Sequence, residues 1–426
     1  MIFDVFHSLG RVDSLPKPFT DQDVFREFFR QVKLAEQLEF SMIWVAESHF
    51  SSEVQKKNSY PVIPHYEGEV GLNTDSFQLA TWIQNITSKI GFGTAITNIV
   101  GGNGGPIAVA DRVRSLAWHN LYVTEKPRSL AIGLASGRFP YINRPFGIVP
   151  QNELEKILWP TIQKYIFLEA LEIFIRLSQN EILSSDEVTE WWIDLSTVSE
   201  DQWLRLEKNR SSFGELELKI TDKKILYKPR WQFEQLKLVP EIQNEDLHKH
   251  LRFVLGSHEP RARELGLKFT NLDIFNLSFT PPQEIEKTHA DMARLIDSYK
   301  NDPTVQIDLK PWQRSRMPRT VLVFIDKDSR QAKQRAEAAI ETYRKAMAGT
   351  VQLPHTDELL SRALVGSPEE IIDQLHPDSP HGFHQNDRLM LWFEFNQSDG
   401  DAIIRQMRLF AEKVMPKWAL HNDSKN

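Results

Sequence analysis

The chain of 426 residues is 41% hydrophobic and 26% charged. That balance is typical of a soluble globular protein and excludes both a disordered chain and one that lives in the bilayer. The formal net charge of -7 argues against a general affinity for nucleic acid or anionic lipid. The absence of cysteine excludes disulfides, thiolate metal sites, iron–sulfur clusters and a cysteine nucleophile.

The N-terminal run from Ile2 to Phe6 is short, apolar and rich in residues that favour strands. It has no basic lead and no long apolar stretch before a small-residue cleavage site, so it does not read as a signal peptide. No stretch of the sequence approaches the roughly 20 apolar residues that a membrane helix needs. We therefore expect a cytoplasmic protein with no membrane partner.

Strands and helices alternate through the first third of the chain. After the first strand, Asp23 to Phe40 carry apolar side chains at helical spacing. Buried strands are predicted at 42–46, 90–96 and 130–134, with helices at 77–86 and from Pro106 onward. Proline suits the first turn of a helix because the N–H that it lacks would have no partner there.

The middle of the chain interrupts this alternation. A long helix starts at Glu153. In the polar, tryptophan-rich stretch at about 179–247 that follows it, apolar residues show neither helical nor strand periodicity. We interpret this stretch as an irregular insertion. Further strands are predicted at 251–255, 272–277, 320–325 and 389–395. Capping boxes at Thr280 and Ser367 indicate where helices between these strands begin.

Continuous apolar runs that alternate with amphipathic helices favour an α/β fold, and eight of them favour a (β/α)8 TIM-type barrel. We expect a single domain over residues 1–426 with insertions, notably between strands four and five. An open doubly wound sheet is the alternative, but it usually carries cofactor glycines after strand one, where this chain reads His7-Ser8-Leu9-Gly10. A barrel displays its site at the carboxyl ends of its strands.

The residues that follow strand two are the first candidates for chemistry. Glu47 and His49 provide a carboxylate and an imidazole, which indicate acid or base catalysis or a contact to a bound ring. A capped loop with a hydrogen-bonded histidine explains them equally well. After strand three, the small and hydroxyl residues from Gly93 to Thr97 would let a flat ligand approach the backbone, although a tight turn would look similar.

Two candidate anion sites follow strands four and five. Ser136, Gly137 and Arg138 can hold a phosphate, because arginine supplies a forked donor and glycine leaves backbone N–H groups open. A solvated surface arginine is the alternative. Gly256 and Ser257 precede a helix whose N-terminus attracts anions, although helix capping by itself also explains the serine.

Glu394 interrupts the aromatic run of the last predicted strand. A carboxylate in such a run is costly to bury unless it has a partner, which makes this glutamate a candidate for the site. Exposure at an edge is the alternative.

Several known motifs are missing from the sequence. It contains neither a P-loop nor a G-x-S-x-G elbow, and the glycines from Gly101 to Gly105 do not continue as a dinucleotide-binding motif. Histidines such as His49, His65 and His119 stand at no ligand spacing. We therefore expect no metal.

Five short segments, each too short to identify a family alone, form a specific pattern in combination. They lie at residues 42–50, 90–96, 131–137, 364–370 and 410–416. Together they resemble the bacterial luciferase-like flavin-dependent monooxygenases, and the last of them is similar to the end of luciferase α chains. The likeness spans both ends of the chain, while the stretch from about 153 to 247 matches only weakly.

This resemblance implies a barrel that binds reduced FMN and uses O2 to oxygenate a small organic substrate such as an aldehyde or ketone. It implies that His49 stabilises or protonates the flavin peroxide, with Glu47 and Glu394 positioned in the same pocket. Ser48 stands where luciferases carry another histidine, which argues against light emission and the aldehyde chemistry linked to it.

The resemblance also implies where the cofactor lies. Ala95 and Ile96 match the place of a non-prolyl cis peptide against the isoalloxazine, so together with Thr94 they would carry the ring. The residues that match the phosphate site are Ser136, Gly137, Arg138, Gly256 and Ser257.

The expected partners are the small-molecule substrate and O2. Because the sequence has no nicotinamide fingerprint, reduced flavin is expected from a separate flavin reductase. The long loop from Ser51 to Leu72 is a candidate lid, and the resemblance is compatible with a homodimer. The nearest rival is an F420-dependent oxidoreductase on the same barrel, and a rival of another class is a flavin-binding protein without turnover.

Overall fold

A curled parallel sheet lies at the centre of the protein. The computed structural model describes residues 1–15, 19–137, 139–209, 223–256, 259–305, 307–349 and 354–418. The nine strands of the sheet are β1 (Ile2–His7), β3 (Met42–Val45), β5 (Gly91–Asn98), β6 (Leu130–Ala135), β9 (Leu251–Leu255), β10 (Leu272–Ile274), β11 (Arg319–Ile325), β12 (Leu364–Gly366) and β13 (Arg388–Trp392).

The sheet curls until its two ends meet. Its strand order is β10-β9-β6-β5-β3-β1-β13-β11-β12. Asn276, just past β10, bridges to Arg319 of β11, with hydrogen bonds from Asn276 N to Pro318 O (2.9 Å) and from Thr320 N to Asn276 O (3.0 Å). The (β/α)8 prediction is therefore confirmed, and β12 is an additional short strand beside the carboxyl end of β11.

The sixth barrel strand is shorter than the predicted run 272–277. β10 ends at Ile274, and beyond it only Asn276 pairs with β11. The next apolar side chains, Phe275 and Leu277, line a cavity instead of extending the strand. A continuous apolar run cannot distinguish these two kinds of burial.

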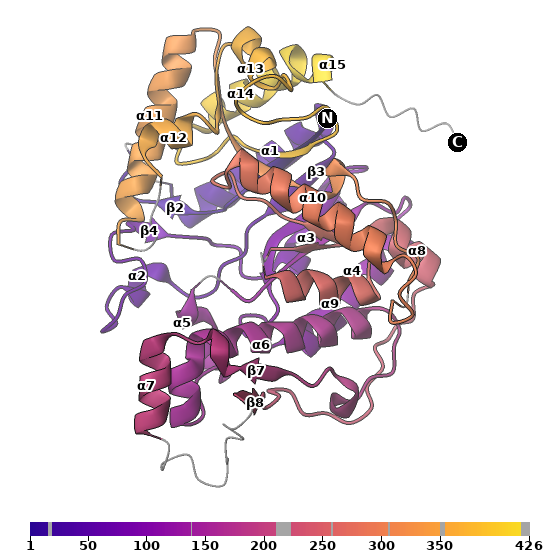
Figure 1. Ribbon diagram of the computed structural model, residues 1–426. Coiled ribbons are helices and arrows are strands. Elements are labelled where there is room, and N and C mark those ends of the chain that lie inside the picture. Colours follow the sequence, from indigo (N-terminus) through magenta and orange to yellow (C-terminus); the bar gives the residue numbers. More distant parts are fainter. Residues whose placement is uncertain are drawn as a thin grey trace.

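Helices cover the outer face of the sheet (Figure 1). The α-helices of the described residues are α1 (Asp21–Gln37), α2 (Ser52–Gln55), α3 (Ser76–Ile86), α4 (Pro106–Tyr122), α5 (Pro140–Asn143), α6 (Glu153–Ser178), α7 (Glu200–Lys208), α8 (Asn244–His250), α9 (Pro260–Phe269), α10 (Pro282–Tyr299), α11 (Ser329–Ala346), α12 (Thr356–Leu360), α13 (Pro368–Gln374), α14 (Gly400–Lys413) and α15 (Met415–Trp418). None of the described helices combines the length and apolar character needed to cross a membrane.

One of the two predicted capping boxes forms. Ser367 caps α13, and Glu370 Oε2 accepts a hydrogen bond from Ser367 N (2.7 Å). The prediction of a capping box at Thr280 is wrong, because α10 begins after Pro281, which stays extended at φ -59° and ψ 142°. A residue before proline avoids the helical region, so Pro282 delays the helix by one residue. Thr280 Oγ1 instead accepts from Leu277 N (3.2 Å).

Side chains alternate between the two faces of the curled sheet, as strand geometry requires. Phe6, Met42, Trp44, Val254 and Met390 belong to a cluster that fills the barrel. Their strand neighbours point outward and pack against the helices in the main core. The barrel is therefore a packed core and not a pore.

A buried ion pair lies toward the amino-terminal end of the barrel. Asp4, which is 0% exposed, accepts hydrogen bonds from Arg388 Nε (2.6 Å) and Nη2 (3.1 Å). Trp44 Nε1 donates to the same carboxylate at 2.7 Å. A carboxylate taken out of water depends on such partners, so this arrangement ties β1, β3 and β13 together.

Between α6 and α8 the chain leaves the barrel. Strands β7 (Trp192–Asp194) and β8 (Lys224–Leu226) pair antiparallel. Glu169 of α6 anchors this part by accepting hydrogen bonds from Tyr227 Oη (2.7 Å) and Arg230 N (3.0 Å). Figure 1 shows α7, β7 and β8 at the opposite end of the molecule from α11 to α15.

Candidate active site

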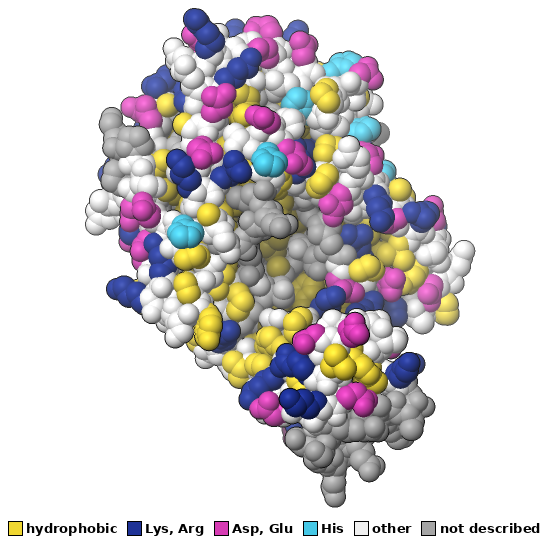
Figure 2. Space-filling view, turned by 60° about the vertical axis from the view of Figure 1, so that its left-hand side comes forward, with side chains coloured by type: hydrophobic (Ala, Val, Ile, Leu, Met, Phe, Trp, Pro, Cys, Tyr) yellow, Lys and Arg dark blue, Asp and Glu magenta, His cyan; other side chains and the backbone are white. Residues whose placement is uncertain are grey.

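A deep cavity opens at the carboxyl ends of the barrel strands. Its volume is 640 Å³, within the range of about 300–1,000 Å³ common for ligand and cofactor pockets. Figure 2 shows the hollowed face of the molecule, with hydrophobic side chains around and inside the hollow. Its wall includes residues at or near the ends of different strands, among them Ser8, Ala46, Ala95, Ala135, Gly256 and Glu394.

Glu47 and His49 form a polar pair on the loop after β3. His49 Nε2 lies 3.0 Å from Glu47 Oε1, and the two side chains are 11% and 1% exposed. Asn103 Nδ2 donates to the same oxygen (2.6 Å), while Ser76 Oγ donates to Glu47 Oε2 (3.2 Å). The carboxylate is thus fixed from several elements, and it orients an imidazole that lines the cavity.

The glycine run after β5 makes room for His49. A Cβ on Gly102 would lie 2.9 Å from His49 Cδ2 and 2.9 Å from Ile142 Cγ2. Both distances are shorter than side chains tolerate, so the close packing of this loop requires glycine. The run that matches no dinucleotide motif therefore has a structural role beside the candidate catalytic histidine.

Ala95 and Ile96 form one wall of the cavity. The peptide bond between them is cis, as the resemblance implied. The pairing of β5 with β6 is irregular between Thr94 and Thr97. Thr94 lies behind the wall, where its Oγ1 accepts a hydrogen bond from Gly133 N (2.9 Å). Thr94 therefore supports the wall, while Ala95 and Ile96 reach the cavity.

The cavity wall brings together three of the residues expected to hold a phosphate, Ser136, Gly137 and Gly256. Two asparagines brace this corner, since Asn143 Nδ2 donates to Ser136 O (2.8 Å) and Asn98 Nδ2 donates to Asn143 Oδ1 (2.7 Å). Arg138 and Ser257, which were expected beside them, lie outside the described residues.

Glu394 reaches the cavity from the end of β13. Its Oε1 accepts hydrogen bonds from Ser8 N (2.5 Å), Ser8 Oγ (2.8 Å) and Trp392 Nε1 (3.2 Å). Burial raises the pKa of Glu394 above its ordinary value, although these donors act in the opposite direction. The glutamate of the aromatic run is therefore buried and partnered, and it is not exposed at an edge.

We expect Glu394→Gln to raise the melting temperature more at about pH 8 than at about pH 5. A carboxyl whose pKa is raised by folding favours the folded state while protonated, and this contribution is lost as pH rises through the folded pKa. Glutamine keeps an acceptor for Ser8 without the charge. Thermal melts of both proteins at the two pH values measure the difference, and a shift independent of pH would contradict the expectation.

Comparison with known proteins finds a family model that matches the N-terminal part of the chain. Residues 1–117 match the family model of luciferase-like monooxygenases. The resemblance to that family is confirmed. No curated protein matches the chain.

Solved structures share the fold over nearly the whole chain. Monooxygenase RslO1 from Streptomyces bottropensis has a TM-score of 0.67 at 17% identity, covering 98% of this chain and 100% of its own. The oxygenating constituent of 3,6-diketocamphane monooxygenase from Pseudomonas putida, solved with FMN, scores 0.55 at 12% identity and covers 99% of each chain. An F420-dependent secondary alcohol dehydrogenase also scores 0.55 at 12% identity, with 98% of each chain covered. At such low identities, these TM-scores show that the chain shares the luciferase-like barrel fold and show nothing further.

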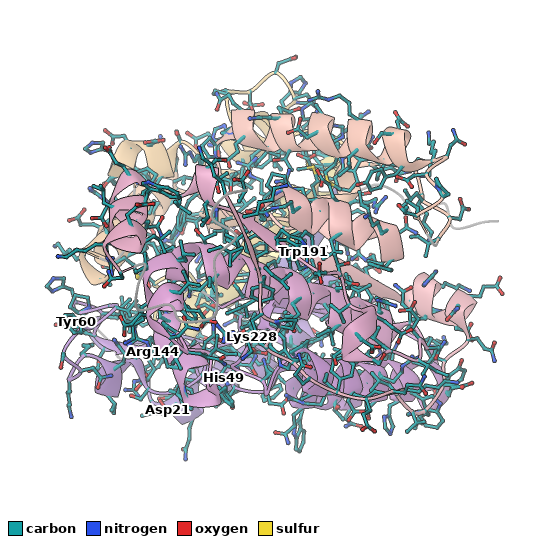
Figure 3. The ribbon with its side chains drawn as sticks, turned by 60° about the horizontal axis from the view of Figure 1, so that its bottom comes forward. Asp21, His49, Tyr60, Arg144, Trp191 and Lys228 are labelled. Carbon is teal, nitrogen blue, oxygen red and sulfur yellow. The ribbon has the colours of Figure 1, made fainter. Side chains whose placement is uncertain are left out.

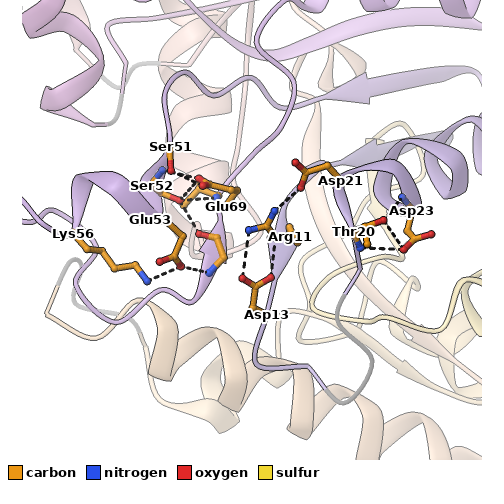
Figure 4. A network of polar contacts seen from close by, with 12 residues as sticks. Arg11, Asp13, Thr20, Asp21, Asp23, Ser51, Ser52, Glu53, Lys56 and Glu69 are labelled. Atoms are coloured by element: carbon orange, nitrogen blue, oxygen red, sulfur yellow. Dashed lines mark hydrogen bonds and ion pairs between the residues drawn. The ribbon is translucent and has the colours of Figure 1, made fainter.

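A roof formed by β2 (Arg11–Val12), β4 (Gly68–Glu69) and the loop Ser51–Leu72 adjoins the cavity of this luciferase-like barrel. Glu69 accepts hydrogen bonds from Ser51 Oγ (2.5 Å) and Ser52 N (2.7 Å), which hold the start of α2 (Figure 4). Arg11 Nη1 donates to Asp21 Oδ1 (2.5 Å) at the start of α1. The candidate lid is therefore paired with the segment after β1, and Arg11 of that segment in turn binds the start of α1.

We expect Gly68→Ala to loosen the roof. Gly68 has φ +113°, and a Cβ there would lie 2.0 Å from Arg11 O. Because the obstacle is backbone, β2 and β4 must separate, at a cost of about 1–3 kcal/mol. Limited trypsin digestion should then cut faster after Lys56 and Lys57.

Gly147→Ala is the matched control for this experiment. Gly147 also has a positive φ (+80°), but a Cβ added there would meet nothing within 4 Å. It introduces backbone strain without a collision, so cleavage in the roof should stay at the wild-type rate. Equal cleavage of the two variants would show that the close contact with Arg11 does not hold the roof.

Sequence reasoning missed several side chains of the site. Tyr66 of the roof and Tyr343 of α11 line the cavity, and burial raises the pKa of the Tyr66 hydroxyl. Neither position carried a signal, because Tyr66 lies in an aperiodic loop and Tyr343 reads as one more residue of a helix. The loops after β3 and β6, which carry His49 and Arg144 (Figure 3), are in contact, since the ring centroids of Phe50 and Phe146 lie 6.1 Å apart.

Proposed function

We propose that the protein is a flavin-dependent monooxygenase that uses reduced FMN and O2 to oxygenate a small organic substrate. The observation that carries this proposal is the cavity, which joins the wall at Ala95 and Ile96 with the Glu47 and His49 pair. Reduced flavin would come from a separate flavin reductase, because the sequence has no nicotinamide-binding fingerprint. The insertion at about 179–247 would belong to the same single domain.

The wall of the cavity fits a flat ring. Ala46, Ala95, Ala135 and Gly256 line it, and such small residues let a planar ligand approach the backbone. Gly256 completes a cradle that a side chain would fill, since a Cβ there would lie 2.1 Å from Ile96 Cδ1. The residues present therefore fit an isoalloxazine.

The polar corner beside this wall suits the cofactor's phosphate. Ser136, Gly137 and Gly256 would hold it from the ends of β6 and β9, with Arg138 and Ser257 as further candidates. The asparagine bridge from Asn98 to Asn143 keeps the backbone of this corner in place.

FMN would supply the activation of O2, a chemistry that no protein side chain provides. His49 would accept or donate a proton during the oxygenation reaction. Because the Glu47 carboxylate can only accept, His49 Nε2 must donate to it, which leaves Nδ1 of the neutral ring able to take up a proton. The roof, with Tyr66 lining the cavity, would exclude water. The apolar side chains of Phe275, Phe279 and Phe395 suit an apolar substrate.

Titration with FMN in both redox states tests the proposal. We expect a change in the visible spectrum on binding, and O2 consumption coupled to product when reduced FMN is supplied. NAD(P)H oxidation by the protein alone should be negligible. Binding of F420 without FMN would favour hydride transfer, for which the F420-dependent alcohol dehydrogenase offers a structural parallel. Flavin binding without O2 consumption would indicate a protein that binds flavin and does not turn over.

A further inference from the structure

The cavity continues past the barrel wall into the space between β1 and α1. His7, the last residue of β1, points outward, and its ring packs against Phe28 of α1 with centroids 4.9 Å apart and planes at 89°. Its neighbour Phe6 points into the barrel. We call this extension the side pocket; its lining includes His7, Leu9, Val24, Glu27, Phe28 and Gln31.

Two polar atoms of the side pocket have no hydrogen-bond partner among the described residues. They are His7 Nε2 and Gln31 Oε1, on residues that are 2% and 3% exposed. Leaving such a buried atom unpaired costs about 1–3 kcal/mol. The neighbouring amides are satisfied, since Gln406 Nε2 donates to Gln397 Oε1 (3.0 Å) and Gln397 Nε2 donates to Phe393 O (2.6 Å).

The two atoms restrict the chemistry of what they bind. Gln31 Oε1 can only accept, so its partner must be a donor, and a carboxylate is excluded. Burial lowers the pKa of His7 to about 3, so its ring is neutral near pH 7 and does not attract an anion. The carboxylate of Glu27 in the lining is already paired with Arg30 (3.3 Å). An ammonium group would therefore be costly to bury against Leu9, Val24 and Phe28. A neutral hydroxyl on an apolar body satisfies all three conditions.

We propose that the side pocket binds an apolar molecule through a neutral hydroxyl group held between Gln31 and His7. That this molecule is the substrate rests on the proposed function. In that case the hydroxyl end of the substrate lies in the side pocket, and its apolar body extends toward the barrel mouth. The hydroxyl donates its single hydrogen to Gln31 Oε1 and accepts from His7 Nε2–H, which requires the tautomer that carries the proton on Nε2.

Isothermal titration calorimetry with 1-octanol and its isomer 1-methoxyheptane tests this proposal on the full-length protein. Both probes have the same composition, but only the alcohol can donate a hydrogen bond. We expect the alcohol to bind at least about 10-fold more tightly, because a site built for a hydroxyl rejects an analogue that leaves its acceptor unpaired. Gln31→Met keeps the side-chain volume and should reduce the preference to within about 2-fold.

Gln22→Met is the matched control, since Gln22 lies on the same helix and is exposed. It should retain the preference for the alcohol. Equal affinity for the two probes in the wild-type protein would overturn the proposal, and so would a preference that survives in both Gln31→Met and His7→Phe. A structure with octanol in which only an ordered water contacts both atoms would overturn it as well. Calorimetry needs neither flavin nor turnover, so this failure is distinct from failure of the FMN titration.

Discussion

Replacing His49 by alanine should lower turnover by about 10²–10⁴-fold, the usual contribution of a positioned acid or base. Affinity for reduced FMN should stay within a few fold, because the wall formed by Ala95 and Ile96 is untouched. Steady-state rates with supplied reduced FMN and fluorescence titration of the flavin measure the two effects. Unchanged turnover would remove His49 from the chemistry.

Two further variants separate this effect from a general disturbance. His65→Ala makes the same substitution at an exposed position of the roof, and it should leave turnover near the wild-type rate. Glu47→Gln keeps an acceptor for Asn103 and removes the charge that orients His49. It should therefore reduce turnover by less than His49→Ala, because the imidazole is still present.

Replacing Arg388 by methionine should lower the free energy of unfolding by about 3–5 kcal/mol, the cost of leaving one partner of a buried pair uncompensated. Asp4 would keep only the hydrogen bond from Trp44 Nε1 at 2.7 Å. Urea denaturation followed by circular dichroism measures the change. A loss below about 1 kcal/mol would show that Asp4 gains little from Arg388.

Two comparisons identify the cause of this loss. Arg30→Met removes the ion pairs of a surface arginine that is 46% exposed, with Asp401 and Glu27, and it should cost at most about 1 kcal/mol. The double variant Asp4→Leu/Arg388→Met removes both charges. It should recover most of the stability, because no buried charge remains without a partner.

The fold followed from the sequence because its signals are local. Parallel strands covered on both faces are apolar throughout, and runs such as 42–46 and 251–255 coincide with β3 and β9 to within one residue. The sequence likewise predicted α1 and α3. The ends of elements were less certain where neighbouring residues compete, as at Thr280, where the two following prolines displaced the helix start.

The site was predicted less completely than the fold. Glu47, His49 and Glu394 follow strands, so the barrel geometry alone brings them to one end. Their partners cannot be read from spacing: Ser76 and Asn103 come from other elements to hold Glu47. The side pocket at His7 and Gln31 gave no signal at all, because its residues read as an ordinary strand and helix.

Periodicity and composition were enough to predict the barrel, to exclude cysteine chemistry and to find the polar groups at the strand ends, because periodicity depends on neighbouring residues and composition on no contact at all. Tertiary structure decided which of those groups meet. Contacts such as Glu394 with Ser8 join residues far apart in the chain, and unpaired atoms such as Gln31 Oε1 exist only once every neighbour is in place. The hydrogen bonds between distant residues and the burial of single polar atoms belong to the packed arrangement, and no local pattern encodes them.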